Sequence, residues 1–185
     1  LINLKNKINF KLEGLASTCA FIPDTNNNLN SITANGKIIQ KGSCILLNNI
    51  DLEITNKDGE GFILIAGTKK INENKEKTIN VNDKKAHYTV DKPWGHELWI
   101  NHGQTNYSFK EVYIKENYQT SLQYHEFKKE TAILYDGECE IIFKNDRNIH
   151  NDDVTAENLA KVIIEPINII DVKTLVLHRI KAISN

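Results

Sequence analysis

Short apolar runs recur along the whole chain, and polar clusters separate them. The runs are rich in Ile, Val, Tyr, Phe and Thr, while the clusters contain Asn, Asp, Gly and Lys. This pattern is typical of β-strands and not of helices. In the first half it predicts strands near 37–40, 43–47, 50–55 and 61–66. In the second half it predicts strands near 96–100, 107–115, 119–125, 131–136, 138–143, 162–170 and 173–183.

Turn signals stand between several of these runs. Asp58-Gly59 and Asp136-Gly137 each lie between two apolar runs, and this arrangement predicts tight hairpins. Residues 155–162 (TAENLAKV) are the only stretch with a passable helix pattern. Many short strands with frequent turns predict an all-β sandwich or barrel, with jelly rolls among the candidates.

Residues 69–86 interrupt the strand pattern. They are polar, dense in Lys, Asn and Glu, and weakly patterned, so we expect an exposed connection there. This connection predicts a division of the chain into a β-rich region at 1–85 and a second domain at 86–185.

Composition narrows the class of protein. The net charge of −1 gives no electrostatic footprint for nucleic acid or an anionic membrane, so we expect neither as a partner. The apolar runs are too short to span a bilayer, and no signal peptide is recognisable. The three cysteines Cys19, Cys44 and Cys139 include no C-x-x-C pair, which predicts buried thiols in a reducing, cytoplasmic protein.

One short segment contains a set of side chains suited to a metal ion. Because side chains alternate along a strand, Gln123 and His125 are expected on one face of the strand near 119–125. Glu130 follows five residues later, at the start of the next predicted strand. An amide oxygen, an imidazole and a carboxylate suit Zn²⁺, Mn²⁺, Fe²⁺ or Co²⁺, and a fourth ligand must come from elsewhere.

The same residues carry a resemblance to a known family. From Gln123 to Gly137 the chain reads Q-x-H-x(4)-E-x(6)-G, which is similar to the first cupin motif, H-x-H-x(4)-E-x(6)-G; Asn117 stands where that motif usually has Gly. With the K-P-W-G element at 92–95 and the S-L-Q-Y-H run at 121–125, the chain resembles the cupin domain of type II mannose-6-phosphate isomerases. That domain also occurs fused to mannose-1-phosphate guanylyltransferases. The resemblance covers about residues 88–183.

The resemblance implies a cupin fold, a double-stranded β-helix or jelly-roll barrel, and further site residues. The family's second motif, P-x-G-x-x-H-R, is matched by His178 and Arg179, with Lys173 and Leu175 in the Pro and Gly places. It implies His178 as the fourth metal ligand, and Lys110 and Arg179 as residues that bind substrate and take part in catalysis. The sequence departs from the family run where Phe127 replaces a His and Lys128 replaces an Arg.

Two functions follow as alternatives. The first is a metal-dependent isomerase that interconverts mannose 6-phosphate and fructose 6-phosphate or a related sugar phosphate, with Zn²⁺ as the first choice of metal. The second is a cupin that binds a sugar or other small ligand without isomerising it, or does other metal chemistry. We also expect a homodimer, and the 1–85 region is either a degenerate second cupin or part of the main barrel. The remaining histidines lack ligand spacing and are expected in solvated loops: His87, His96, His102 and His150.

Overall fold

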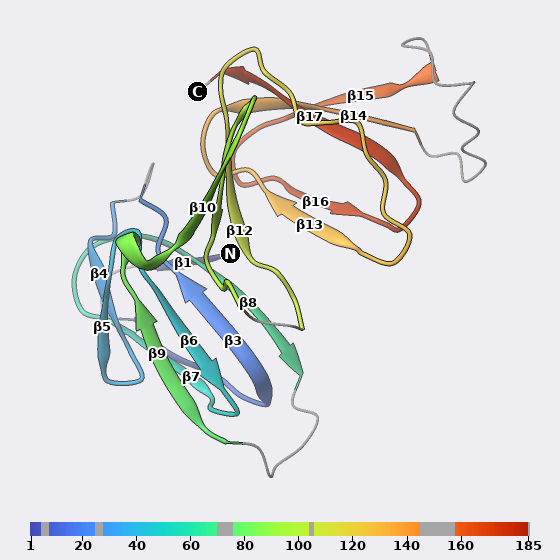
Figure 1. The fold of residues 1–185 in the computed structure, drawn as a ribbon. Helices are drawn as coiled ribbons and strands as arrows, with labels where there is room; N and C mark the ends of the chain where they lie inside the picture. Colours follow the sequence, from blue (N-terminus) through green and yellow to red (C-terminus); the bar gives the residue numbers. More distant parts are fainter. Residues whose placement is uncertain (5–7, 25–27, 70–75, 104–105, 145–157, 185) are drawn as a thin grey trace. The chain divides into compact units, whose positions relative to one another are not determined.

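The computed structural model describes residues 1–4, 8–24, 28–69, 76–103, 106–144 and 158–184. These residues form β-strands, turns and a short 3-10 helix, η1 (Lys84–Ala86), which confirms the all-β prediction (Figure 1). The chain divides into two compact units. The first contains Leu1–Val90 and Glu97–Glu111, and the second contains Asp91–His96 and Val112–Asn185. No helix in the described part of the chain is long and apolar enough to cross a membrane.

The first unit is built from two antiparallel sheets. One has the order β1 (Ile2–Leu4), β8 (Gly61–Lys69), β3 (Leu15–Phe21), β6 (Cys44–Asn48) and β9 (Thr78–Asn82). The other has the order β2 (Ile8–Leu12), β7 (Leu52–Asn56), β4 (Ser31–Ala34) and β5 (Lys37–Gln40). Without β9, the orders 1-8-3-6 and 2-7-4-5 are those of a complete eight-stranded jelly roll.

Apolar side chains fill the space between these two sheets. The core consists of buried aliphatic residues from both sheets and from the segment between β3 and β4: Leu4, Ala20, Ile22, Leu29, Ile32, Ala34, Ile39, Ile45, Leu47, Leu52, Ile54 and Ile63. The other face of β3 is buried as well, since Cys19 and Phe21 point away from this core and Phe21 packs edge-on against Phe109. Burial on both faces explains why β3 shows little polar alternation.

The second unit repeats much of this strand order. β13 (Glu130–Ile133) pairs with β16 (Ile169–Val172), as β3 pairs with β6. β14 (Glu138–Lys144) lies between β15 (Ala160–Ile164) and β17 (Leu177–Ser184), as β4 lies between β5 and β7. Isolated bridges place 119–123 beside β17, where β2 lies beside β7. Among the described residues no strand pairs with the second edge of β13, the position that β8 takes beside β3.

A further sheet has the order β10 (Tyr88–Lys92), β11 (Gly95–Trp99) and β12 (Lys110–Ile114), and the division between the units falls within each of these strands. Gly95, from the K-P-W-G element, is required here. Its φ is 154°, and an added Cβ would lie 1.9 Å from the backbone oxygen of Tyr113. The glycine therefore lets the two strands approach closely.

Both predicted Asp-Gly hairpins are wrong. β7 and β8 flank Gly59 but belong to different sheets, and β13 and β14 flank Gly137 but also belong to different sheets. The glycines do turn the chain with positive φ, but the burial of each strand in its own sheet decides its partner. A tight hairpin instead joins β4 and β5 through Asn35 and Gly36, both at positive φ.

Three other predictions need correction. The polar segment 69–86 is not only an exposed connection, because β9 within it pairs with β6 along five residues. The predicted helix at 155–162 is wrong at its end, where Ala160–Ile164 is β15, and its first residues, 155–157, lie outside the described residues. The predicted strand near 119–125 is reduced to single bridges at Gln119 and Gln123.

Candidate metal centre

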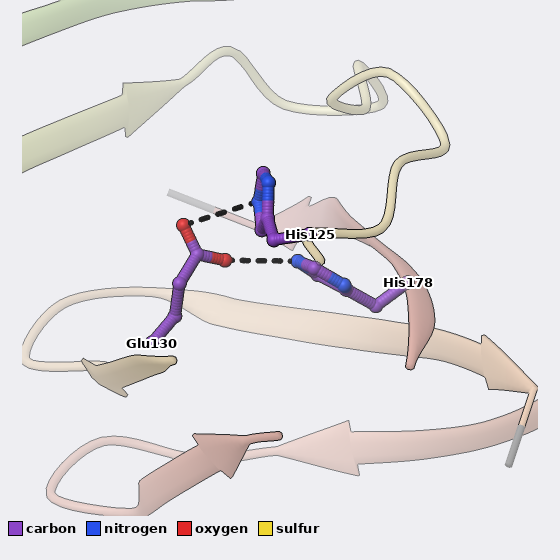
Figure 2. A group of neighbouring side chains, drawn as sticks. All are labelled: His125, Glu130 and His178. Atoms are coloured by element: carbon purple, nitrogen blue, oxygen red, sulfur yellow. Dashed lines mark hydrogen bonds and ion pairs between the residues drawn. The ribbon is translucent and has the colours of Figure 1, made fainter. Parts of the chain in front are cut away.

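Three side chains of the second unit converge on one point. Glu130 is the first residue of β13, His178 is the second residue of β17, and His125 precedes β13 in the chain. Figure 2 shows both imidazole rings turned toward the Glu130 carboxylate. One donor atom from each residue lies within 4.8 Å of the others, which is close enough for all three to bind one ion.

The carboxylate joins the two histidines. The His178 Nε2 atom lies 3.0 Å from Glu130 Oε2, and the His125 Nε2 atom lies 3.5 Å from Glu130 Oε1. The two rings are 5.6 Å apart and roughly perpendicular. His178 is 4% exposed, and the other two residues are half-buried. The donors therefore face one another in a partly enclosed position.

The orientation of His178 is fixed from its far side. Its Nδ1 atom lies 2.9 Å from the carbonyl oxygen of Val176, so Nδ1 carries a proton and donates it to that oxygen. The neutral ring then has its lone pair on Nε2, which faces Glu130. A backbone carbonyl that holds the distal nitrogen of a histidine is the usual support for a metal ligand.

Electrostatics keep the carboxylate ionised. The hydrogen bond from His178, assisted by Lys128, lowers the pKa of Glu130 to about 2 despite its partial burial. The same hydrogen bond raises the pKa of His178 above its ordinary value. Without metal, the His178 imidazolium and the Glu130 carboxylate thus stabilise each other, and a metal ion binding here must replace the proton on Nε2.

Gln123 is placed beside this cluster by its backbone. Gln123 and His178 exchange both backbone hydrogen bonds, with N···O distances of 3.0 and 2.8 Å. Directly opposed residues of an antiparallel pair send their side chains to the same face. Gln123 therefore lies on the same face as His178, with an exposed side chain. Its role as a ligand stays a prediction.

The turns around the cluster keep a glycine-like backbone without glycine. Asn117 and Leu175, which stand in the Gly places of the two family motifs, both have φ of 65°. The Leu175 N–H donates to the His125 carbonyl oxygen at 2.8 Å. This bond ties the turn that precedes His178 to the segment that carries His125, so the loss of glycine has not removed the turn.

A pocket of about 470 Å³ adjoins the cluster at Glu130. The residues that line it come from one end of the β13–β16 pair, where β13 begins and β16 ends: Lys129, Glu130, Thr131, Asp171, Val172, Lys173, Thr174 and Leu175. The Thr131 hydroxyl donates to Asp171 at 2.6 Å, across the same strand pair. The pocket thus offers hydroxyl groups, carboxylates and two lysines next to a candidate ligand.

Lys110 and Arg179, predicted from the family resemblance, are placed differently. Lys110 lies in the first unit, with its ammonium 3.4 Å from Glu97 and 4.4 Å from the centre of the Trp99 ring. Arg179 follows His178 on β17 opposite Ile142, so it lies on the face away from His178. Its buried Nε has no hydrogen-bond partner among the described residues. Neither Lys110 nor Arg179 joins the three converging residues.

The other described histidines and the three cysteines lie outside the candidate metal centre. His87 is buried against Phe21, with Nε2 3.0 Å from the Gly42 carbonyl oxygen, so its prediction as a solvated loop residue is wrong. His96 stacks on Tyr113, and the exposed His102 packs against Tyr88. His150 lies outside the described residues. All three cysteines are free and buried, as predicted.

Sequence reasoning missed Lys128 and Val176 as parts of the site. Lys128 forms an ion pair with Glu130, and its position two residues before Glu130 could have suggested a shared face. The Val176 contribution comes from a backbone carbonyl, which has no sequence signal at all.

The fold and the comparisons with known proteins define the class as a cupin. A solved cupin structure is similar in fold: the crystal structure of Lactobacillus farciminis oxalate decarboxylase in a formate complex. The superposition has a TM-score of 0.65 and covers 98% of this chain and 71% of the oxalate decarboxylase chain. The identity is 15%, so this likeness concerns the fold alone.

The particular family is shown by the sequence match. The family model described as "Mannose-6-phosphate isomerase C-terminal" matches residues 79–175, more than half of the chain, and the chain belongs to this family. The matched range includes His125 and Glu130 and ends before His178, whose place in the cluster rests on its geometry. No curated protein matches the chain.

Proposed function

We propose that this chain binds a divalent metal ion through His125, Glu130 and His178, and that it isomerises mannose 6-phosphate and fructose 6-phosphate or a related sugar phosphate. The observation that supports the proposal most is the convergence of three donor atoms within 4.8 Å beside a pocket, in a member of this family. Gln123, on the face of His178, is the proposed fourth ligand.

The donor set fits a borderline divalent ion. Two imidazole nitrogens and a carboxylate oxygen suit Zn²⁺ first, with Mn²⁺, Fe²⁺ or Co²⁺ as alternatives. Such an ion would polarise the carbonyl and hydroxyl oxygens of an aldose or ketose, between which a proton must move. The protein would hold the ion with the ionised Glu130 and with the Nε2 atom of His178, whose opposite nitrogen is fixed by Val176.

The pocket has groups for a phosphorylated sugar. Lys129 and Lys173 line it and can pair with a phosphate, while Thr131 and Asp171 can hydrogen-bond to sugar hydroxyls. Neither Lys110 nor Arg179 lines this pocket, so their predicted roles in substrate binding and catalysis have no support from it. Carbohydrate and anion contacts are therefore better assigned, in this proposal, to the β13–β16 end of the second unit.

One observation favours the alternative of a cupin that binds a sugar without isomerising it. Phe127 stands where the family usually has a histidine, and its side chain is 94% exposed. It cannot supply the acid–base chemistry of an imidazole. If that histidine takes part in the family's reaction, this chain would keep the metal and the ligand but not the turnover.

The two functions are separated by a metal analysis followed by an activity assay. The purified protein, loaded with Zn²⁺, Mn²⁺ or Co²⁺, would be assayed for conversion of mannose 6-phosphate to fructose 6-phosphate by a coupled reaction. We expect turnover that is lost in Glu130→Gln and His178→Ala and kept in the control His102→Ala, an exposed histidine outside the cluster. Bound metal without turnover in any form would exclude the isomerase and favour the alternative. Sedimentation of the same sample tests the proposed homodimer.

A further inference from the structure

Lys128 makes the shortest contact to the candidate metal ligand Glu130. Its Nζ lies 2.6 Å from Glu130 Oε1, compared with 3.5 Å for the Nε2 atom of His125 at the same oxygen. The other carboxylate oxygen is taken by His178 at 3.0 Å. Both oxygens that could bind a metal ion are therefore engaged by nitrogen donors, and one of these donors is an ammonium group.

An ammonium group and a divalent cation compete for the charge of this carboxylate oxygen. A lysine ammonium donates protons and has no lone pair, so it cannot become a ligand itself. A metal ion bound between Glu130 and His125 would meet a like charge at close range, and the two charges would repel each other. As long as Lys128 stays on the carboxylate, its charge therefore opposes the binding of a metal ion.

We propose that Lys128 is an internal counter-ion that occupies the Glu130 carboxylate in the metal-free protein and is displaced when a divalent cation binds. The proposal rests on the metal site proposed above and adds a competitor to it. Displacement is physically easy, because the Lys128 side chain is 45% exposed and its flexible stem can carry the charge into water. The apparent metal affinity is then lower than the three ligands alone would give.

Lys129 provides a matched comparison. It is the next residue, carries the same charge and lines the pocket beside Glu130, but among the described residues it forms no ion pair with Glu130. A general effect of positive charge near the metal would involve both lysines alike. Competition for the carboxylate oxygen involves Lys128 alone.

The test is a calorimetric titration of the metal-free full chain with Zn²⁺, and in parallel with Co²⁺, at constant pH. The variants are Lys128→Met, Lys128→Gln, the charge-preserving Lys128→Arg, and the control Lys129→Met. An exposed ion pair is worth up to about 1 kcal/mol, so we expect about two- to fivefold tighter binding in Lys128→Met and Lys128→Gln. Lys128→Arg is expected to bind like the wild type, and Lys129→Met to change the affinity less than the other neutral variants.

The outcomes separate the two proposals. Unchanged affinity in Lys128→Met and Lys128→Gln, with a wild type that binds metal, would overturn the counter-ion and leave the metal site standing. Equal tightening by Lys129→Met would also overturn it, since only a general charge effect would then remain. If neither the wild type nor any variant binds either ion, the metal site itself fails. Two neutral substitutions are used so that a folding defect in one does not decide the result.

Discussion

The two units share much of one strand order but fill their interiors differently. In the first unit β7 sends Leu52 and Ile54 into a core of aliphatic side chains, each with no exposed surface. In the second unit the corresponding strand, β17, carries His178, which meets Glu130 from β13. The first interior stabilises the protein by burying apolar surface, and the second contains charged groups that suit an ion.

The same type of β-sandwich can therefore hold either an apolar core, which stabilises the fold, or charged side chains, which suit a binding site. Charged groups inside a sheet sandwich are costly unless they are paired. In the second unit the carboxylate is paired with an imidazole and an ammonium, so the site is tolerated without metal. Buried apolar side chains of this unit, such as Ile141 and Cys139, each keep 6% of their surface exposed, whereas Leu52 and Ile54 of the first unit keep none.

The largest expected effect tests this contrast in packing. Leu52→Ala in the first unit should cost about 3–4 kcal/mol of the free energy of unfolding, because it leaves a cavity in a dry core. Ile141→Ala, from the second unit, should cost about 2 kcal/mol, because part of the lost volume is already near solvent. Urea denaturation of both variants measures the difference. Equal losses would show that the two interiors are packed alike.

A smaller effect concerns pH in the metal-free protein. Glu130 has a lowered pKa of about 2, so its contribution is present above the ordinary carboxyl pKa of 4.5 and is lost as the pH falls toward 2. His178 has a raised pKa, so its contribution is present below 6.5 and is lost as the pH rises through the raised value. The pair should therefore stabilise the metal-free protein most between about pH 4.5 and 6.5.

Urea denaturation of the wild type and Glu130→Gln from pH 3 to pH 9 checks this prediction. We expect the wild type to exceed the variant by about 1–2 kcal/mol near pH 5.5, and the gap to narrow on both sides. A gap that does not change with pH would contradict the pairing of these two groups.

The smallest expected effect concerns the turn before His178. Leu175 has φ of 65° and is 37% exposed, so glycine there should relieve backbone strain and lose little packing. We expect Leu175→Gly to raise the free energy of unfolding by about 0.5–1 kcal/mol. Asn117→Gly should change it by less than about 0.5 kcal/mol, because asparagine tolerates this conformation. Thermal denaturation compares the two, and a stability loss in Leu175→Gly would show that the leucine side chain is needed.

Sequence reasoning predicted the strand-rich class because alternation and β-branched residues are local signals. It did not predict which strands share a sheet. The Asp-Gly turns at Gly59 and Gly137 look like hairpins, but each carries the chain from one sheet to the other. The segment Leu15–Phe21 was missed as a strand for a related reason: burial on both faces removes the alternation that marks most strands.

The candidate site was predictable to the extent that its residues are close in sequence. The spacing of His125 and Glu130 suggested a shared site, and the family resemblance added His178, which the structure brings within reach of both. The pairing of Lys128 with Glu130 and the support of His178 by Val176 depend on tertiary geometry. Spacing alone could not reveal either contact.

We propose that the second unit binds one divalent ion through His125, Glu130 and His178. The most direct test is to count the tightly bound ions per chain after Co²⁺ loading and dialysis, with the absorption spectrum recorded as a report on the ligands. We expect one Co²⁺ per chain in the wild type, with a spectrum that is lost in both Glu130→Gln and His178→Ala. A wild type without bound Co²⁺, or variants that keep the same ion and spectrum, would contradict it.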